Sequence, residues 1–191
     1  MDESQSGLSL DQVARRLDAS GMPWAVFAGA AALVYGAARS LTDVDILVPA
    51  AEANRLVDLF PEGDLHFAQA GILVWTLPGF DLLAGLGFVD LDAEMAARLT
   101  RHNLAGVDVS VISPEDNILL KAFMGRGPEE GKHDWEDIEA MMSHLATLDW
   151  EYLRWRASVH RDPQRVQQIL GRLEELWGML GRSSRQERRP R

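Results

Sequence analysis

The stretch GAAALVYGAARSLTDVDILV, Gly29 to Val48, decides the fold that we expect for this chain. It opens with a turn of small residues, continues as a short apolar helix ending at Gly36, and closes on Asp43 and Asp45 inside an apolar, β-branched run. Alternate residues of a strand point to the same face, roughly 6.5–7 Å apart along the chain. The sequence therefore predicts two carboxylates side by side at the start of a strand.

Two neighbouring carboxylates need a counter-charge. At an effective dielectric constant of ~20, like charges ~5 Å apart repel by about 3 kcal/mol. Hard oxygen ligands of this kind suit Mg²⁺, which also takes oxygens from substrate phosphates. We predict that Asp43 and Asp45 are metal ligands. The simpler alternative is that Asp43 forms a turn after Thr42 and that Asp45 is solvated on an edge strand.

Composition describes an ordinary globular chain of 191 residues, 47% hydrophobic and 25% charged. This length suits one domain, or a core with a small helical appendage. The net charge of −10 gives no long-range positive field to attract nucleic acid. Cysteine is absent, which excludes disulfides and thiolate zinc sites and fits a cytoplasmic protein. The polar residues 1–12 lack a leader pattern, and no apolar run is long enough for a membrane span.

The order of elements predicts an α/β (α+β) fold, a mixed sheet flanked by helices with a helical C-terminal part. A capping box, Ser9 with Gln12, opens a first helix that Gly21 ends. Strands are expected at 24–28, 43–48, 65–69, 71–77 and 80–83, with a hairpin or final strand at 104–112. Helices are expected at 30–35, 52–60, 114–124, 134–145, 149–160 and 163–180, and 92–101 fits a short helix or an irregular strand. The predicted parts are a core at 1–113, a helical part at 114–181 and a disordered tail at 182–191.

The segment Gly29 to Val48 resembles the DNA polymerase β-like nucleotidyltransferase superfamily, whose pattern is Gly with a second small residue, a spacer, and Asp-apolar-Asp-apolar. Gly29 and Asp43-Val44-Asp45-Ile46 fit this pattern, whereas Ala30 stands where Gly or Ser is usual. The lead-in Arg39-Ser40-Leu41-Thr42 resembles a bacterial subgroup of minimal nucleotidyltransferases and abortive-infection toxins. The segments 112–116 with Leu120-Lys121, and 132–138, resemble the same subgroup in the same order.

The resemblance implies a third carboxylate on an adjacent strand. Asp81, between Phe80 and Leu82, is the best candidate, with Asp90 and Asp92 as runners-up. Asp43, Asp45 and Asp81 would hold one or two Mg²⁺ ions, and Asp81 would also serve as the general base. The implied reaction is transfer of NMP from an NTP such as ATP to a hydroxyl.

The nucleotide would be held by residues from three segments: Gly29, Ala30, Arg39, Thr42 and Lys121. Backbone N–H groups at the start of the 30–35 helix could hold a phosphate, and Arg126 and Lys132 are weaker phosphate candidates. Lys121 has a simpler alternative role, that of a solvated lysine on a helix. Asp134 and Asp137 could likewise occupy the first turn of a helix, where acidic residues are favoured.

Three functions stay open from the sequence. The first is a Mg²⁺-dependent nucleotidyltransferase acting on a tRNA end, a protein hydroxyl or a small hydroxylated antibiotic. A toxin role with an antitoxin partner is one form of this function. The second is a degenerate, non-catalytic nucleotide- or partner-binding domain, which Ala30 favours. The third is a structural module that forms a homodimer through an apolar helical stripe, Leu170, Leu173, Leu176, Trp177 and Leu180.

Overall fold

The computed structural model describes residues 7–67, 72–85 and 90–187, and side chains as far as Gly181. The ends of two predicted strands, at 68–69 and 71, and the tail residues 188–191 lie outside the described residues. The chain divides into two compact units. One comprises Met1–Val34 and Arg39–Ser113, and the other comprises Tyr35–Ala38 and Pro114–Arg191.

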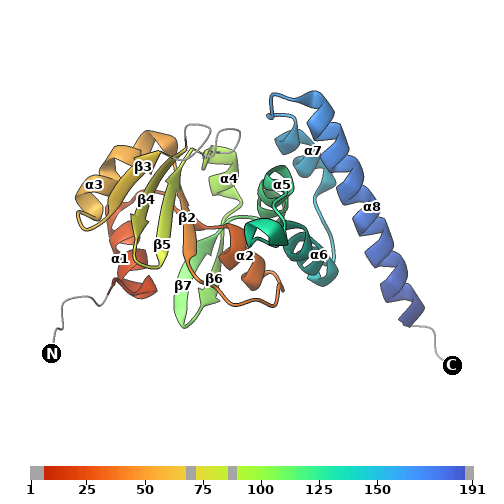
Figure 1. The fold of residues 1–191 in the computed structure, drawn as a ribbon, viewed down its shortest axis with the longest axis horizontal. Helices are drawn as coiled ribbons and strands as arrows, with labels where there is room; N and C mark the ends of the chain where they lie inside the picture. Colours follow the sequence, from red (N-terminus) through yellow and green to blue (C-terminus); the bar gives the residue numbers. More distant parts are fainter. Residues whose placement is uncertain (1–6, 68–71, 86–89, 188–191) are drawn as a thin grey trace. The chain divides into compact units, whose positions relative to one another are not determined.

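The first unit is built on a seven-stranded sheet with the order β3-β4-β5-β2-β1-β7-β6 (Figure 1). Its strands are β1 (Ala25–Val26), β2 (Val44–Val48), β3 (Asp64–Phe67), β4 (Leu73–Leu77), β5 (Phe80–Ala84), β6 (Thr100–Leu104) and β7 (Val107–Val111). The β2–β5 and β1–β7 pairs are parallel and the other four pairs are antiparallel. This confirms the predicted mixed α/β fold with a helix-flanked sheet.

Side-chain alternation explains why the central strands form. In β5 the residues Phe80, Leu82 and Ala84 are buried, whereas Asp81 and Leu83 between them are half-buried. This period of two is the pattern of a strand with one apolar face. β2 instead becomes buried on both faces after Asp45, as expected for a central strand. Asp45 and Asp81 therefore lie at the boundary between the half-buried and the fully buried parts of the sheet.

The β6–β7 hairpin lies at one edge of the sheet, and a two-residue turn joins its strands. Leu104 pairs with Val107, and the residues between them, Ala105 and Gly106, have φ of 51° and 88°. Two consecutive positive φ angles are typical of the tight turns that join antiparallel strands. The sequence left 92–101 open between a helix and a strand, and the structure contains both, a helix followed by the start of β6.

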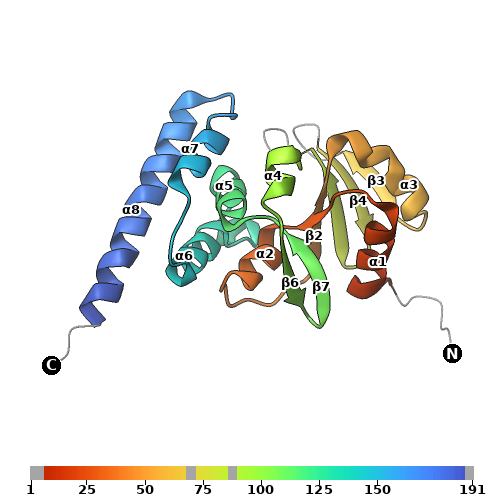
Figure 2. The ribbon, with the colours of Figure 1, turned by 180° about the vertical axis from the view of Figure 1, so that it is seen from behind.

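The first unit also carries short helices: α1 (Leu10–Ser20), α2 (Ala28–Val34), η1 (Ala50–Arg55), α3 (Leu56–Leu59) and α4 (Ala93–Ala97). The predicted capping box of α1 is confirmed, and Gly21 ends the helix with a left-handed φ of 69°. α1 contacts both α3 and β7, and Figure 2 shows α1 and α3 together at the same face of the sheet.

The second unit is helical: α5 (Pro114–Met124), η3 (Pro128–Glu130), α6 (Asp134–His144), α7 (Trp150–Ala157) and α8 (Pro163–Glu187). α5 contacts α6 and α7, and both of these contact α8 (Figure 1). α8 ends seven residues later than the predicted end at Leu180, at Glu187. The helix runs on because residues 181–187 contain good helix formers and the first proline comes only at Pro190. Among the described helices, none has the length and apolarity that crossing a bilayer requires.

Candidate functional site

Asp45 of β2 and Asp81 of β5 are register partners in neighbouring parallel strands. Figure 1 shows the two strands, β2 and β5. Partners in adjacent strands lie ≈ 4.8 Å apart and point to the same face of the sheet. Both side chains are half-buried. The structure therefore brings together two of the three predicted carboxylates, from segments 36 positions apart in the sequence.

Asp81 has a neighbour on its other side that the sequence analysis missed. Thr76 of β4 is its register partner in the antiparallel β4–β5 pair, and the Thr76 hydroxyl donates a 2.7 Å hydrogen bond to Asp81 Oδ1. Thr76, Asp81 and Asp45 thus form one row across three strands. The signal was present in the sequence, because Thr76 is the one polar residue between Leu73 and Leu77.

The predicted glycine turn also lies at this row. The Phe27 backbone N–H donates to the carbonyl of Asp45 at 3.0 Å, so α2 begins directly beside β2. The turn into α2 is tight, with Ala28 at a φ of 52°. Gly29 is half-buried, whereas the Ala30 side chain is only 1% exposed. Ala30 is therefore almost fully enclosed, and Gly29 is the more exposed residue of the turn.

Arg39 lies over Gly29. Its guanidinium carbon is 3.6 Å from the position that a Cβ on Gly29 would occupy, and a methyl carbon of Leu41 is 3.7 Å from the same point. Any side chain longer than alanine at position 29 would compete with the guanidinium for space. The structure thus brings a predicted cation against the predicted turn, next to the strand that carries Asp45.

Asp43 precedes the first residue of β2. The β2–β5 pairing reaches this point, since Val44 N–H donates to the Gly79 carbonyl at 3.0 Å. The Thr42 hydroxyl donates to Asp43 Oδ1 at 3.1 Å. Within the described ranges, however, no group of three or more His, Cys, Asp or Glu side chains is gathered closely enough to hold a metal ion. The fit to a divalent ion therefore rests on the adjacent pair Asp45 and Asp81, both hard carboxylate ligands.

The two runners-up for the third carboxylate have local structural roles. Asp90 Oδ1 accepts a hydrogen bond from the Ala50 N–H at 2.9 Å. Asp92 is the N-cap of α4 and accepts from the Met95 N–H at 2.9 Å. Neither residue lies on a described strand, so Asp81 alone of the three candidates has a register position beside Asp45.

Lys121 belongs to a different cluster, inside the helical unit. Its side chain is 2% exposed, and its ammonium group lies 3.0 Å from Asp134 and 2.8 Å from Asp137. Arg126 joins them, since both its backbone N–H and its Nε donate to Asp134 Oδ2 at 3.0 Å. Two predicted phosphate contacts, Lys121 and Arg126, are thus paired with Asp134, and Lys121 also with Asp137. The Lys121 ammonium group is therefore already neutralised within the helical unit.

The electrostatics of this cluster are internally balanced. Burial alone would raise the pKa of Asp134, but the hydrogen bond from Arg126 and the charge of Lys121 outweigh it and hold the pKa below its ordinary value. The carboxylate is consequently charged in the folded protein at neutral pH. The cluster joins the C-terminal half of α5 to the first turn of α6.

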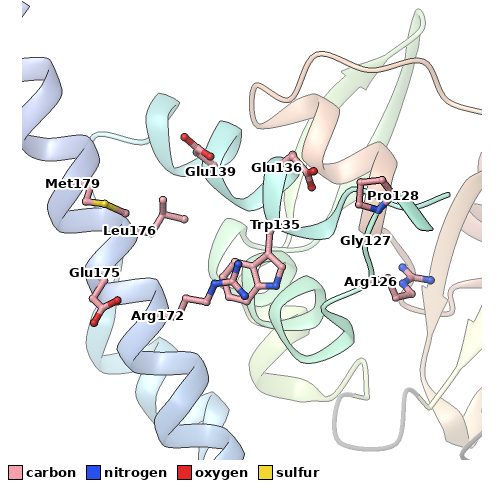
Figure 3. Close-up of a pocket in the computed structure, with 10 residues that line it drawn as sticks. All are labelled: Arg126, Gly127, Pro128, Trp135, Glu136, Glu139, Arg172, Glu175, Leu176 and Met179. Carbon is pink, nitrogen blue, oxygen red and sulfur yellow. The ribbon is translucent and has the colours of Figure 1, made fainter. Parts of the chain in front are cut away.

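A separate pocket of about 320 Å³ lies in the helical unit, between α6, α8 and the segment after α5 (Figure 3). The Arg172 guanidinium stacks on the Trp135 ring at 3.5 Å from its centroid, and the two side chains overlap in Figure 3. Glu136 and Glu139 line the pocket from α6. Its lining includes none of the predicted carboxylate ligands, so it is distinct in composition from the Asp45–Asp81 row.

No family model matches the sequence, and no curated protein matches it. Solved structures do resemble the fold. An antigenic nucleotidyltransferase-like protein from Paracoccidioides brasiliensis is 19% identical, with a TM-score of 0.55 and coverage of 92% of this chain and 93% of that one. ANT(2")-Ia in complex with adenylyl-2"-tobramycin is 16% identical, with a TM-score of 0.53 and coverage of 78% and 92%.

The lincosamide antibiotic adenylyltransferase LnuA, bound to lincomycin, is a third such structure. It is 12% identical, with a TM-score of 0.50 and coverage of 73% of this chain and 100% of that one. These likenesses extend over most of each compared chain, so they concern the whole architecture and not one motif. The chain therefore has the fold of the nucleotidyltransferase-like proteins.

Proposed function

We propose that this protein is a divalent-metal-dependent nucleotidyltransferase that moves NMP from an NTP to a hydroxyl acceptor. The observation that carries the proposal is the register pairing of Asp45 with Asp81 in a nucleotidyltransferase-like fold. Two adjacent, half-buried carboxylates on one sheet face concentrate negative charge that a divalent cation would neutralise. Mg²⁺ meets this need, because it binds one or two carboxylates together with substrate phosphates.

In this proposal Asp43, Asp45 and Asp81 hold the metal. A bound Mg²⁺ would neutralise the charge that develops on the phosphates during transfer. Arg39, which lies over Gly29, would pair with a phosphate of the NTP. The first turn of α2 and Thr42 both lie near the start of β2. Asp81 would accept the proton of the acceptor hydroxyl as the general base.

The class of acceptor molecule is inferred from the compared proteins and from the net charge of the chain. A small hydroxylated molecule is favoured by two of the compared proteins, one solved with an adenylylated tobramycin and one with lincomycin. The net charge of −10 suits a cationic acceptor of this kind. A tRNA end or a protein as acceptor, a toxin role and an antitoxin partner rest on the sequence resemblance alone.

One observation favours a second candidate, a nucleotide-binding domain without catalysis. Among the described residues the third carboxylate, Asp43, does not complete a metal-holding group with Asp45 and Asp81. A domain that binds an NTP through the pair and through Arg39 would not need the complete set. The two candidates differ in turnover and not in binding.

The test is a titration of Mg²⁺ or Mn²⁺ with each NTP, followed by thermal stability and by pyrophosphate release over a broad acceptor screen. Asp43→Ala and Asp45→Ala should weaken metal-dependent NTP binding by about two orders of magnitude with the fold intact. Asp58→Ala, an exposed carboxylate of α3, is the matched control and should bind normally. Equal binding by all four proteins would overturn the proposal. Binding without turnover would favour the second candidate.

A further inference from the structure

Thr76 stands out because its hydroxyl is committed to a carboxylate of the proposed site. It donates to Asp81 Oδ1 at 2.7 Å, a usual length for a hydroxyl–oxygen hydrogen bond. The two residues are also register partners on β4 and β5. The strands therefore fix both ends of this bond, which a contact between two loops would not achieve.

The hydrogen bond from Thr76 affects how the Asp81 carboxylate is oriented, because Asp81 lies between two different partners. On one side its partner is Asp45, a second carboxylate. On the other side its partner is Thr76, a donor. Repulsion between the carboxylates favours rotamers that turn Asp81 away from Asp45, and the two-fold torsion at the end of an aspartate side chain is soft. A hydroxyl that holds Oδ1 removes part of this freedom and leaves Oδ2 available to a ligand.

We propose that Thr76 is a positioning residue that orients the Asp81 carboxylate so that Asp81 and Asp45 can bind a divalent cation together. This inference rests on the proposed function, because it presumes that the pair binds a metal. Thr76 does not touch the metal or the substrate in this scheme and acts only through Asp81. Its hydroxyl, and not its shape, is the property that matters.

Two substitutions separate the hydroxyl from the shape. Thr76→Val keeps the branched side chain in the strand and removes the donor, whereas Thr76→Ser keeps the donor and removes a methyl group. Thr147→Val, at an exposed loop residue of the helical unit, is the matched control for the loss of a threonine hydroxyl. Asp81→Asn removes one of the two carboxylates and so tests whether the Asp45–Asp81 pair binds the metal.

The primary measurement is Mn²⁺ binding to the full chain, from the electron paramagnetic resonance signal of free Mn²⁺, with and without a non-hydrolysable ATP analogue. We expect Thr76→Val to raise the Mn²⁺ dissociation constant about 5- to 20-fold and Thr76→Ser to stay within about twofold of wild type. A merely structural threonine would lower the unfolding midpoint in EDTA without changing this constant. The unfolding midpoint is measured for every variant.

The outcomes distinguish this inference from the proposed function. If Asp81→Asn loses Mn²⁺ binding while Thr76→Val binds like wild type, the positioning role is wrong and the metal site stands. If Thr76→Ser is as impaired as Thr76→Val, the hydroxyl is not the cause and the inference is again overturned. If wild type and Asp81→Asn bind Mn²⁺ equally, the proposed metal site fails and the inference fails with it.

Discussion

Asp45 and Asp81 face the same side of the sheet as direct partners across the parallel β2–β5 pair. Two consequences follow from this one relationship. The carboxylates repel each other when no cation is present, and they form a ready pair of hard ligands when one is. Stability and metal binding are therefore opposed at this point of the sheet, which makes the pair accessible to experiment without knowledge of the acceptor.

Asp81→Asn should stabilise the metal-free protein. Removing one of two like charges on neighbouring strands relieves a repulsion that would be about 3 kcal/mol at the most for a separation near the ~5 Å strand spacing, and the asparagine oxygen can still accept from Thr76. We expect a free energy of unfolding in urea with EDTA that is about 1–2 kcal/mol higher than for wild type. Added Mn²⁺ should then stabilise wild type and leave the variant unchanged. Asp58→Asn is the control, and destabilisation of Asp81→Asn in EDTA would contradict the repulsion.

Lys121→Met should destabilise the protein by about 3–5 kcal/mol, because it leaves Asp134 and Asp137 buried without the ammonium group that neutralises them. The measurement is urea unfolding at pH 7. Lys132→Met, at a less buried lysine in the same unit, should change the free energy by less than about 0.5 kcal/mol. A Lys121→Met protein with wild-type stability but weakened NTP binding would restore Lys121 as a phosphate ligand.

Acid should weaken the helical unit through Asp134. Its pKa is lowered in the folded protein from an ordinary value of 3.8, so the ionised form is favoured by folding. This contribution to stability is fully present above about pH 4 to 5 and is lost as the pH falls through 3.8 toward the folded-state pKa. Urea unfolding between pH 3 and pH 7 should show this loss in wild type.

The control for this pH dependence is Asp134→Asn, which cannot ionise. Its free energy of unfolding should be lower than that of wild type at pH 7, because Lys121 and Arg126 lose a charged partner. The difference between the two proteins should shrink as the pH falls below 4. A difference that stays constant from pH 7 to pH 3 would show that Asp134 does not titrate in this range in either state.

The sequence predicted the local structure of single segments better than the contacts between distant segments. Asp43, Asp45 and the Gly29 turn became candidates because spacing and residue type within one segment carry that information. The family resemblance suggested Asp81 on an adjacent strand, but strand register does not lie within one segment. The direct pairing of Asp45 with Asp81, and the hydroxyl of Thr76 beside Asp81, therefore needed the structure. Thr76 was passed over because a threonine is ordinary in a strand.

Lys121 illustrates the opposite case. Its sequence context resembled a functional segment, and a lysine on a helix can reach a phosphate as easily as a carboxylate. Asp134 and Asp137 follow 13 and 16 residues later, and nothing local shows that α6 turns them back onto α5. The distinction depends on long-range packing, which places the Lys121 ammonium group against Asp134 and Asp137.

Gly36→Ala should destabilise the protein more than an ordinary glycine substitution. Gly36 has a φ of 110°, which L side chains rarely adopt, and a Cβ there would lie 2.5 Å from Cγ and 3.0 Å from Cβ of His144. These atoms are at the backbone end of the His144 side chain, so rotating the ring cannot relieve the contact. We expect a loss of about 2–4 kcal/mol in the free energy of unfolding.

Gly21→Ala separates the two causes. Gly21 also has a positive φ, 69°, but an added Cβ would meet no atom within 4 Å. This control should lose only the conformational cost, about 1 kcal/mol. The double variant Gly36→Ala/His144→Ala still places a Cβ at 144 and should therefore recover only part of the loss. Equal destabilisation by Gly21→Ala and Gly36→Ala would mean that φ alone requires the glycine and that the contact with His144 does not.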